Sequence, residues 1–429
     1  MTEIILNDWP GWLLILLSFY VVIRLRKKWK DDNLTFALCF VLAMHHVLAL
    51  TNAYLFTIHG ADADAVRFHR LGVEWAVSGK LSVSSGAEFY QQLLGIFYRI
   101  FSPSHLFGEE LSIIAFLFAC FVLIKLIDFL NITRYRVGLL LLFGLLPTNL
   151  VLGSVTMRES YQILFFMLAV YWGLRFHLEY TKGAMIFCVF SAIIMGCFHG
   201  ALILYMLFLL PVLFLWFPKQ VSNSSDSGWR FTRKRFIVIS AILILIIGIL
   251  TIGVLLEIQG LWELASVFSG KGLKYAMDHR TILMSEVAPD ARANYGIMLD
   301  TSSLGSLIKT TSLAYIYYLF APFPWQITNW LDVYAFAESL LRFVLILFSI
   351  ISWYRAEGMK RSIWGLLLVI YISMTCLWAM GTVNYGTSIR HHLLTNWIIV
   401  ILGGPVLIDF VLRQFRKKSL ILKTIKRGV

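Results

Sequence analysis

The sequence predicts an all-α, polytopic membrane protein, and its composition and its recurring apolar runs are the observations that predict it. Hydrophobic residues make up 59% of the 429 residues and charged residues only 14%, with a mean hydropathy of +0.77. A soluble domain carries about 45–50% apolar and about 25% charged residues. Runs long enough to cross a ~30 Å hydrocarbon core recur along the whole length. We therefore expect one integral membrane domain over residues 1–429.

The net charge of +13 does not indicate a nucleic-acid partner, because of where the charges lie. Lys and Arg collect in short segments that flank the apolar runs, which is the pattern that orients helices in a bilayer. The first apolar run has no basic segment before it, so we expect no cleavable signal peptide. The five cysteines form no C-x-x-C pair, which argues against a zinc site or a disulfide scaffold. The expected partner is the lipid bilayer.

The basic flanks also predict a topology of about 11–12 transmembrane helices. Arg24–Lys30 follows the first span, so the N-terminus is expected outside and the second span returns to the outer face. Residues 217–235 form the longest expected cytoplasmic loop, and 413–429 a basic cytoplasmic tail. The expected spans are about 12–23, 34–57, 111–130, 137–155, 161–174, a tight pair around 198–200, 236–256, 335–353, 363–380 and 394–412.

Two large outer loops, 58–109 and 257–304, are expected to carry interfacial helices. In the first loop, residues 67–78 and 87–101 have mixed apolar and polar residues at helical spacing, as helices at a membrane surface do. The apolar stretch 307–320 does not fit a simple alternation of sides. It is expected either to be re-entrant, to lie in the interface, or to pair with another short crossing hidden in the long loop.

Two carboxylates, Asp62 and Asp64, stand directly after an apolar run, at the expected outer edge of the bilayer. One of them could deprotonate an acceptor hydroxyl, and both could share a divalent cation, Mg²⁺ or Mn²⁺, with phosphate oxygens. Alternatively, they cap a helix that begins near Ala65. His69 could orient the same site or could be an ordinary packing residue.

Arginines recur in the outer turns and loops, where an anionic substrate group would need them. Arg158-Glu159 lies in a short turn between two spans, and Glu159 could hold the planar guanidinium in place for a phosphate. The alternative is a surface ion pair of little consequence. Arg390 and His391 lie in a third cluster with hydroxyl groups and a glycine, which suits a lipid-linked phosphate. Arg292 in the second outer loop is a further candidate.

Four short motifs resemble those of membrane glycosyltransferases of the GT-C fold. The pattern Asp64-Ala65-x-x-Phe68-His69 just outside an early span resembles the first-outer-loop acidic motif of the protein O-mannosyltransferase and aminoarabinose-transferase group. The turns 154–160, 321–325 and 384–390 resemble a pattern in multispanning proteins of surface-polysaccharide pathways. In the GT-C group the acidic loop follows span one, whereas here an extra span precedes it.

This resemblance implies inverting sugar transfer from a polyprenyl-phosphate or -diphosphate donor to a glycan or lipid-linked acceptor. Transfer would take place on the outer face of a bacterial inner membrane, in exopolysaccharide, capsule or O-antigen assembly. The catalytic acidic residue would correspond to Asp64, with Asp62 as its neighbour. Two alternatives stay open: a Wzy-like polymerase of oligosaccharide repeat units, and a transporter or lipid-linked sugar flippase, which would place ionisable residues near mid-membrane.

Overall fold

The computed structural model describes residues 7–58, 62–80, 82, 84–179, 182–216, 280–282, 293–300 and 302–427, without the side chains of 62, 182 and 415–427. In this part the regular elements are helices, apart from one β-bridge between Asn294 and Asn384. The predicted all-α polytopic membrane protein is therefore confirmed. The expected span 236–256, the loop 217–235 and most of the loop 257–304 lie outside the described residues.

Six helices in the described part are long and apolar enough to cross a membrane, and a bent pair of shorter helices would make a seventh. The six lie where the sequence predicts spans. They are α2 (Trp9–Trp29), α3 (Asp32–Tyr54), α6 (His105–Phe129), α16 (Trp330–Arg355), α17 (Gly358–Gly381) and the Asn396–Gln414 part of α19 (Asn396–Arg427). Helix α19 continues through the basic tail, which the sequence analysis treats as a separate segment.

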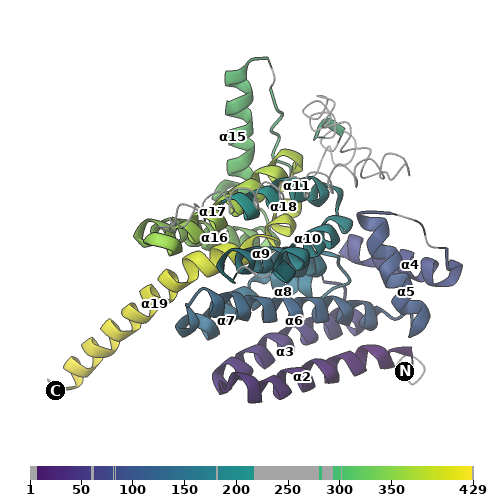
Figure 1. Cartoon of the computed structure of the whole chain (residues 1–429), viewed down its shortest axis with the longest axis horizontal. Helices are drawn as coiled ribbons and strands as arrows, with labels where there is room; N and C mark the ends of the chain where they lie inside the picture. Colours follow the sequence, from purple (N-terminus) through teal and green to yellow (C-terminus); the bar gives the residue numbers. More distant parts are fainter. Residues whose placement is uncertain are drawn as a thin grey trace, which may run out of the picture.

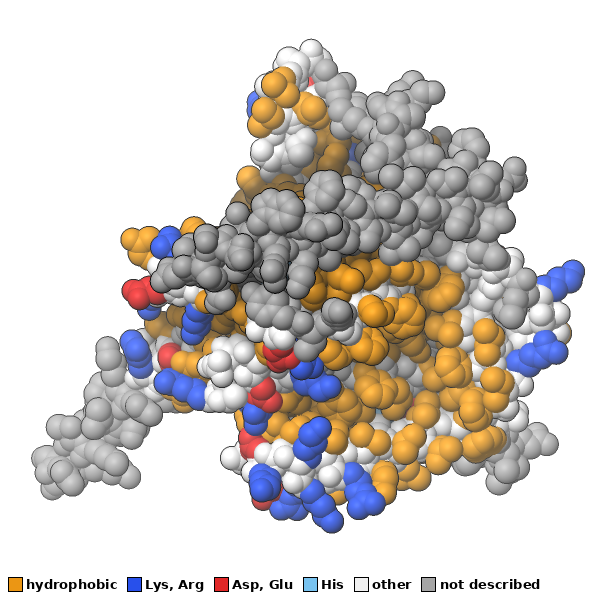
Figure 2. Space-filling view, viewed as in Figure 1, with side chains coloured by type: hydrophobic (Ala, Val, Ile, Leu, Met, Phe, Trp, Pro, Cys, Tyr) orange, Lys and Arg blue, Asp and Glu red, His pale blue; other side chains and the backbone are white. Residues whose placement is uncertain are grey.

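Helix α6 lies among the other helices (Figure 1), and its residues are buried around most of its circumference. It packs against α2 and α3 on one side and against α9 (Glu159–Glu179) on the other. A helix that is apolar all round belongs inside a larger bundle. By contrast, α2 leaves Leu16 and Ile23 more than half exposed. Figure 2 shows a broad hydrophobic surface, with Lys and Arg gathered toward its edges, as a lipid-facing belt requires.

Short polar residues start these helices where apolar sequence alone would not define a boundary. Asp31 accepts a hydrogen bond from the backbone N–H of Leu34 at 3.0 Å and caps α3. Ser104 accepts one from Phe107 at 3.1 Å and caps α6. Such side chains satisfy N–H groups that have no partner inside the helix, which matters most where water is scarce.

Two helices, α4 (Asp62–Ser78) and α5 (Ala87–Ile100), form the first large loop at the positions where the sequence predicts helices. They pack closely against each other, because a side chain at Gly95 would come within 2.5 Å of Cβ of Trp75. Their placement in the membrane interface stays a prediction. Helix α4 begins at Asp62, three residues before the expected start, so Asp64 lies in its first turn.

The expected span 137–155 is not one continuous helix. Helix α7 (Arg136–Gly144) and α8 (Pro147–Gly153) meet at a bend of 62°. Pro147 lacks the N–H that a continuous helix would need, and it disfavours helical conformation in the residue before it. The carboxylate of Glu338 in α16 accepts hydrogen bonds from the N–H and the hydroxyl of Thr148, at 2.9 and 2.5 Å. The N–H that the break leaves free at Thr148 is therefore satisfied by the buried side chain of Glu338.

Helix α15 (Leu304–Phe320) contains the stretch whose topology the sequence left open. Its last carbonyl groups end inside the protein and are bonded by side chains of other helices. His392 Nε2 lies 2.8 Å from the carbonyl oxygen of Tyr318, Arg342 donates to that of Leu319 at 3.1 Å, and Ser339 donates to that of Phe320 at 2.7 Å. A 17-residue helix can end there because its polar groups are satisfied within the protein.

Candidate active site

The centre of the candidate site is a charged cluster that joins three segments far apart in the sequence. Arg390, in α18 (Tyr385–His392), donates from Nη1 to Oδ2 of Asp64 in α4 and from Nε to Oε1 of Glu159 at the start of α9. The exposed fractions of the three side chains are 18% for Arg390, 46% for Asp64 and 4% for Glu159. Asp64 thus faces open space while its partners are mostly enclosed.

Local sequence accounts for where Arg390 and Glu159 stand. Asn384 caps α18 through a 2.7 Å hydrogen bond from the N–H of Thr387, and Arg390 falls in the last turn of this short helix. Glu159 occupies the first turn of α9. A cation near a helix C-terminus and an anion near a helix N-terminus are each stabilised by the helix dipole. The C-terminal turn of α18 and the N-terminal turn of α9 are joined by the ion pair between Arg390 and Glu159.

The turn 154–158 contains Arg158 and directly precedes Glu159, and side chains of two other helices hold its backbone in place. Ser154 Oγ lies 3.0 Å from Nδ1 of His45 in α3. The hydroxyl of Ser112 in α6 both accepts from the N–H of Met157 and donates to its carbonyl, each at 3.2 Å. The backbone ahead of Arg158 is therefore fixed from both sides, and the polar turn is not a loose surface loop.

Arg158 itself is partly buried beside this cluster. Its Nη1 donates to the carbonyl of Phe198 at 3.1 Å, and its guanidinium lies 5.8 Å from the centre of the Phe68 ring. Burial lowers the pKa of Arg158, although arginine stays charged at neutral pH. Burial also opposes the charge of Arg390, but Glu159 and Asp64 outweigh it and raise the pKa of Arg390. Within the described side chains, two arginines thus face two carboxylates.

Aromatic and imidazole rings lie against this cluster. The His391 ring stacks on Trp378 with centroids 3.9 Å apart, and Nδ1 of His391 lies 3.0 Å from the hydroxyl of Thr382. His199, from the turn between α10 (Lys182–Cys197) and α11 (Gly200–Leu215), meets Trp378 edge-on at 4.8 Å. Burial, followed by the charges of Arg390 and Arg158, lowers the pKa of His391 well below its ordinary value. These surroundings favour the neutral form of His391.

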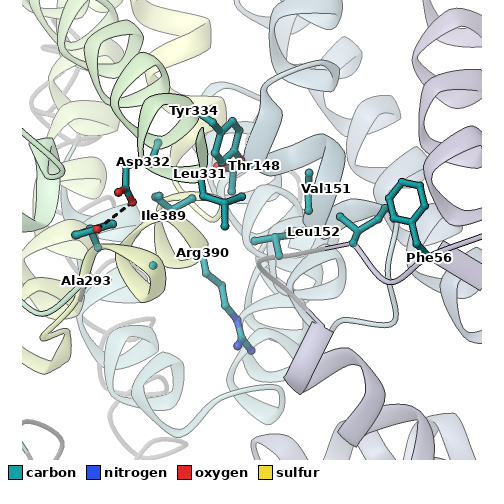
Figure 3. A pocket seen from close by; sticks show the side chains of 14 residues that line it. Phe56, Thr148, Val151, Leu152, Ala293, Leu331, Asp332, Tyr334, Ile389 and Arg390 are labelled. Atoms are coloured by element: carbon teal, nitrogen blue, oxygen red, sulfur yellow. Dashed lines mark hydrogen bonds between the residues drawn. The ribbon is translucent and has the colours of Figure 1, made fainter. Parts of the chain in front are cut away.

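An apolar cavity of about 410 Å³ opens beside Arg390. Its apolar lining comes from the segment after α3, from α8, from α16 and from α18: Phe56, Ile58, Val151, Leu152, Leu331 and Ile389. Figure 3 shows Arg390 at the margin of this cavity, with its guanidinium pointing away from Leu331 and Tyr334. Hydrocarbon and charge are therefore adjacent, as an amphiphilic ligand requires.

Comparison with known proteins does not place this chain. No protein-family model, curated protein or solved structure matches it.

The structure brings together five residues that the sequence analysis selected: Asp64, Arg158, Glu159, Arg390 and His391. Arg158 and Glu159 do not form the exposed surface ion pair of the alternative interpretation, because Glu159 is buried and bonds to Arg390. Two other selected positions, the side chain of Asp62 and all of Arg292, lie outside the described residues. The cation at Asp62 and Asp64 therefore stays a prediction.

Among the described residues, the contacts of His69 lie outside this cluster. It is buried, its Nδ1 lies 2.9 Å from the hydroxyl of Tyr98, and its ring stacks on that of His105 with centroids 3.6 Å apart. These contacts point into the packing between α4, α5 and α6 and not toward Asp64. The expectation that His69 orients the site is not supported, and the packing alternative accounts for it.

A buried histidine whose pKa is lowered should make the folded protein less stable in acid. Burial, followed by the charge of His105, lowers the pKa of His69 to about 3, whereas an unfolded histidine titrates near pH 6.5. Below about pH 6.5 the unfolded chain therefore binds a proton that the folded protein does not. The free energy of unfolding should fall with decreasing pH, by up to about 1.4 kcal/mol per pH unit for each such histidine.

This pH dependence can be measured as the unfolding temperature in detergent between pH 7.5 and pH 5. The His69→Gln variant should show a smaller decrease over this range than the unchanged protein. An equal decrease in both would show that His69 does not contribute.

Sequence reasoning missed His199 and Trp378. Trp378 lies inside an apolar run, where a tryptophan is an ordinary core or interface residue. His199 lies in a turn that the sequence analysis recognised only as a connection between two spans. The one available signal was that a histidine occupies the position before a helix, where Ser, Thr, Asp or Asn is usual.

Proposed function

We propose that this protein is a membrane glycosyltransferase that uses a polyprenyl-phosphate- or polyprenyl-diphosphate-linked sugar donor. One observation carries the proposal: Arg390 lines an apolar cavity of about 410 Å³, and its guanidinium bonds to a partly exposed carboxylate, Asp64. An apolar chain and an anionic head group could be held there at the same time. In this proposal the site faces the outer side of a bacterial inner membrane, as the basic flanks predict.

The hydrogen-bonding groups left over at the two arginines support phosphate binding. Arg390 uses Nε and Nη1 on its carboxylates, and in the described part Nη2 has no hydrogen-bond partner. The Nε of Arg158 is likewise without a partner among the described residues. Planar guanidinium groups bind phosphate oxygens through paired N–H donors. A phosphate that contacted both groups would supply the missing hydrogen-bond acceptors.

Asp64 supplies the base that transfer to a hydroxyl needs. One of its oxygens is bound by Arg390, which fixes the orientation of the carboxylate. The other could take the proton of the acceptor hydroxyl while the hydroxyl oxygen bonds to the anomeric carbon. The bond from that carbon to the phosphate oxygen breaks, and its electron pair leaves with the polyprenyl phosphate or diphosphate. The arginines stabilise this negative charge.

Replacing Asp64 tests this assignment. The Asp64→Asn variant keeps the shape and an acceptor for Arg390 but cannot take a proton, so sugar transfer should fall by about 10²–10⁴-fold. The measurement is incorporation of labelled sugar from polyprenyl-linked donors in membranes, together with the surface polysaccharide made by cells carrying only the variant. Glu74→Gln is the matched control, because Glu74 lies on the same helix and is 62% exposed.

Full activity in Asp64→Asn would rule out the assignment, whereas loss in both variants would indicate damage to α4. The products also separate single-sugar transfer from a Wzy-like polymerase, which would use the same phosphate site. Addition of one sugar to each acceptor supports the first, and growth of a ladder of repeat units supports the second.

A transporter or lipid-linked sugar flippase is a second candidate, favoured by one buried network. His46 in α3 lies 3.0 Å from a carboxylate oxygen of Glu110 in α6 and 2.9 Å from the hydroxyl of Ser18 in α2. All three are buried in candidate membrane spans, where ionisable residues often serve transport. For a transporter, Glu110→Gln would abolish function while Asp64→Asn would not. The glycosyltransferase proposal expects Asp64→Asn to be the more damaging.

A further inference from the structure

The turn between α10 and α11 places an unusual residue at the start of a helix. His199 adopts an extended conformation, with φ −163° and ψ 129°, and its Nδ1 accepts a hydrogen bond from the backbone N–H of Ala201 at 3.2 Å. Ser, Thr, Asp and Asn are the usual residues for this role, because their short side chains reach the first free N–H groups. A residue that departs from a local rule is often retained for function.

This hydrogen bond determines which nitrogen of His199 carries the proton. A backbone N–H is always a donor, so Nδ1 must be the unprotonated acceptor. A neutral imidazole has one N–H, which is then on Nε2. The first residue before α11 therefore carries a hydrogen-bond donor, the Nε2–H of His199, on the ring nitrogen opposite the one that caps the helix.

The surroundings of His199 are those of the candidate site. Its ring lies 4.8 Å from that of Trp378 and 6.4 Å from that of His391. The carbonyl of the preceding residue, Phe198, accepts from Arg158. The side chain of His199 is partly buried. Among the described residues, its Nε2 has no hydrogen-bond partner. Within these residues the Nε2–H donor is therefore not used by the protein itself.

Burial, together with two nearby guanidinium groups, also favours the neutral form of this donor. Burial, followed by the charges of Arg158, His391 and Arg390, lowers the pKa of His199 well below its ordinary value. A neutral donor can stabilise negative charge without giving up its proton. The charged imidazole would instead be repelled by the two guanidinium groups.

We propose that His199 is a further substrate-binding residue, whose Nε2–H donates a hydrogen bond to a phosphate oxygen of the polyprenyl-linked donor. Its partners in binding that phosphate are Arg158 and Arg390. This inference rests on the proposed function, because it assigns a ligand to the same site. As the sugar–phosphate bond breaks, charge accumulates on the phosphate oxygens, and a donor fixed by the helix start needs no rearrangement to stabilise it.

Two amide substitutions separate this role from helix capping. In His199→Asn the amide oxygen can still cap α11, but the donor at the Nε2 position is lost. In His199→Gln the longer side chain can place an N–H near that position. Binding is measured in detergent with polyprenyl monophosphate, and with the uncharged polyprenol as the matched control ligand.

For polyprenyl monophosphate we expect His199→Asn to weaken binding about ten-fold or more, since hydrogen bonds to charged groups are among the stronger ones. His199→Gln should recover part of this loss. Both variants should bind polyprenol as the unchanged protein does, and His199→Asn should keep its unfolding temperature. Unchanged affinity of His199→Asn for polyprenyl monophosphate would overturn the proposal.

The same ligands distinguish failure of this inference from failure of the proposed function. If the unchanged protein binds polyprenyl monophosphate no better than polyprenol, the phosphate site itself is refuted. If it prefers the phosphate and His199→Asn does so equally, only the role of His199 is refuted.

A measurement on the unchanged protein covers the case in which the variants do not fold. In ¹⁵N NMR of histidine-labelled protein, His199 should be protonated at Nε2 from pH 5.5 to pH 8. Its Nε2 resonance should shift with polyprenyl monophosphate and not with polyprenol. Absence of any such histidine resonance would overturn the proposal.

Discussion

Replacing Arg390 by alanine should abolish sugar transfer, with a loss of at least about 10²–10³-fold, because one side chain serves both the carboxylates and the proposed phosphate. Without it, the Asp64 carboxylate is no longer held in one orientation. The buried carboxylate of Glu159 loses the Arg390 N–H that donates to its Oε1. Arg390→Lys should also lose most activity, since a single ammonium group lacks the planar fork that reaches two carboxylates and a phosphate together. Labelled-sugar transfer in membranes is the measurement.

A second substitution separates loss of chemistry from loss of structure. An unpaired buried carboxylate destabilises the fold, so Arg390→Ala should lower the unfolding temperature as well as the activity. The double variant Arg390→Ala/Glu159→Gln removes that charge and should recover stability without recovering transfer. Arg70→Ala is the control for removing an arginine, because Arg70 is 70% exposed on α4. Recovery of transfer in the double variant would contradict the proposed role of Arg390.

The second large effect is expected at Arg342, away from the site. Arg342 and Glu338 form a buried ion pair in α16 at 3.3 Å, with both side chains 2% exposed. Glu338 also accepts from Thr148 at the start of α8, and Arg342 donates to the end of α15. Arg342→Met leaves the buried carboxylate of Glu338 without its cationic partner, which should cost about 3–5 kcal/mol of stability.

This effect should appear as a lower unfolding temperature in detergent and as less protein in membranes. The double variant Glu338→Gln/Arg342→Met should recover at least half of the loss, because glutamine is neutral and still accepts from Thr148. Arg355→Met is the matched control, since Arg355 is exposed at the end of the same helix. An equal decrease in Arg355→Met and Arg342→Met would contradict this account.

The sequence predicted well those features that depend on local pattern. Apolar runs and basic flanks located the long helices, and helical spacing located α4 and α5. The carboxylate at Asp64 and the arginines at 158 and 390 stood out because charge is rare in so apolar a chain. What the sequence could not supply was distance, since Asp64 and Arg390 are in contact although more than 300 residues separate them.

The features that sequence reasoning did not locate have physical reasons of their own. His69 follows Asp64 by five residues, but helical geometry turns it toward Tyr98 and His105. The bend between α7 and α8 depends on a partner, Glu338, that lies on another helix. His199 acts through its tautomer, which depends on a single hydrogen bond to Ala201. None of these contacts leaves a periodic trace in the sequence.

The length of α10 and α11 bears on the thickness of the membrane around the site. Each has 16 residues, which corresponds to about 24 Å of helix, against a hydrocarbon core of about 30 Å. A hairpin of this length is too short to span that core unaided, and local thinning of the bilayer is one way to accommodate it, at a cost set by hydrophobic mismatch. The head-group layer would then dip toward the turn that carries His199. A lipid-linked phosphate could reach Arg158 and Arg390 without being lifted out of the membrane.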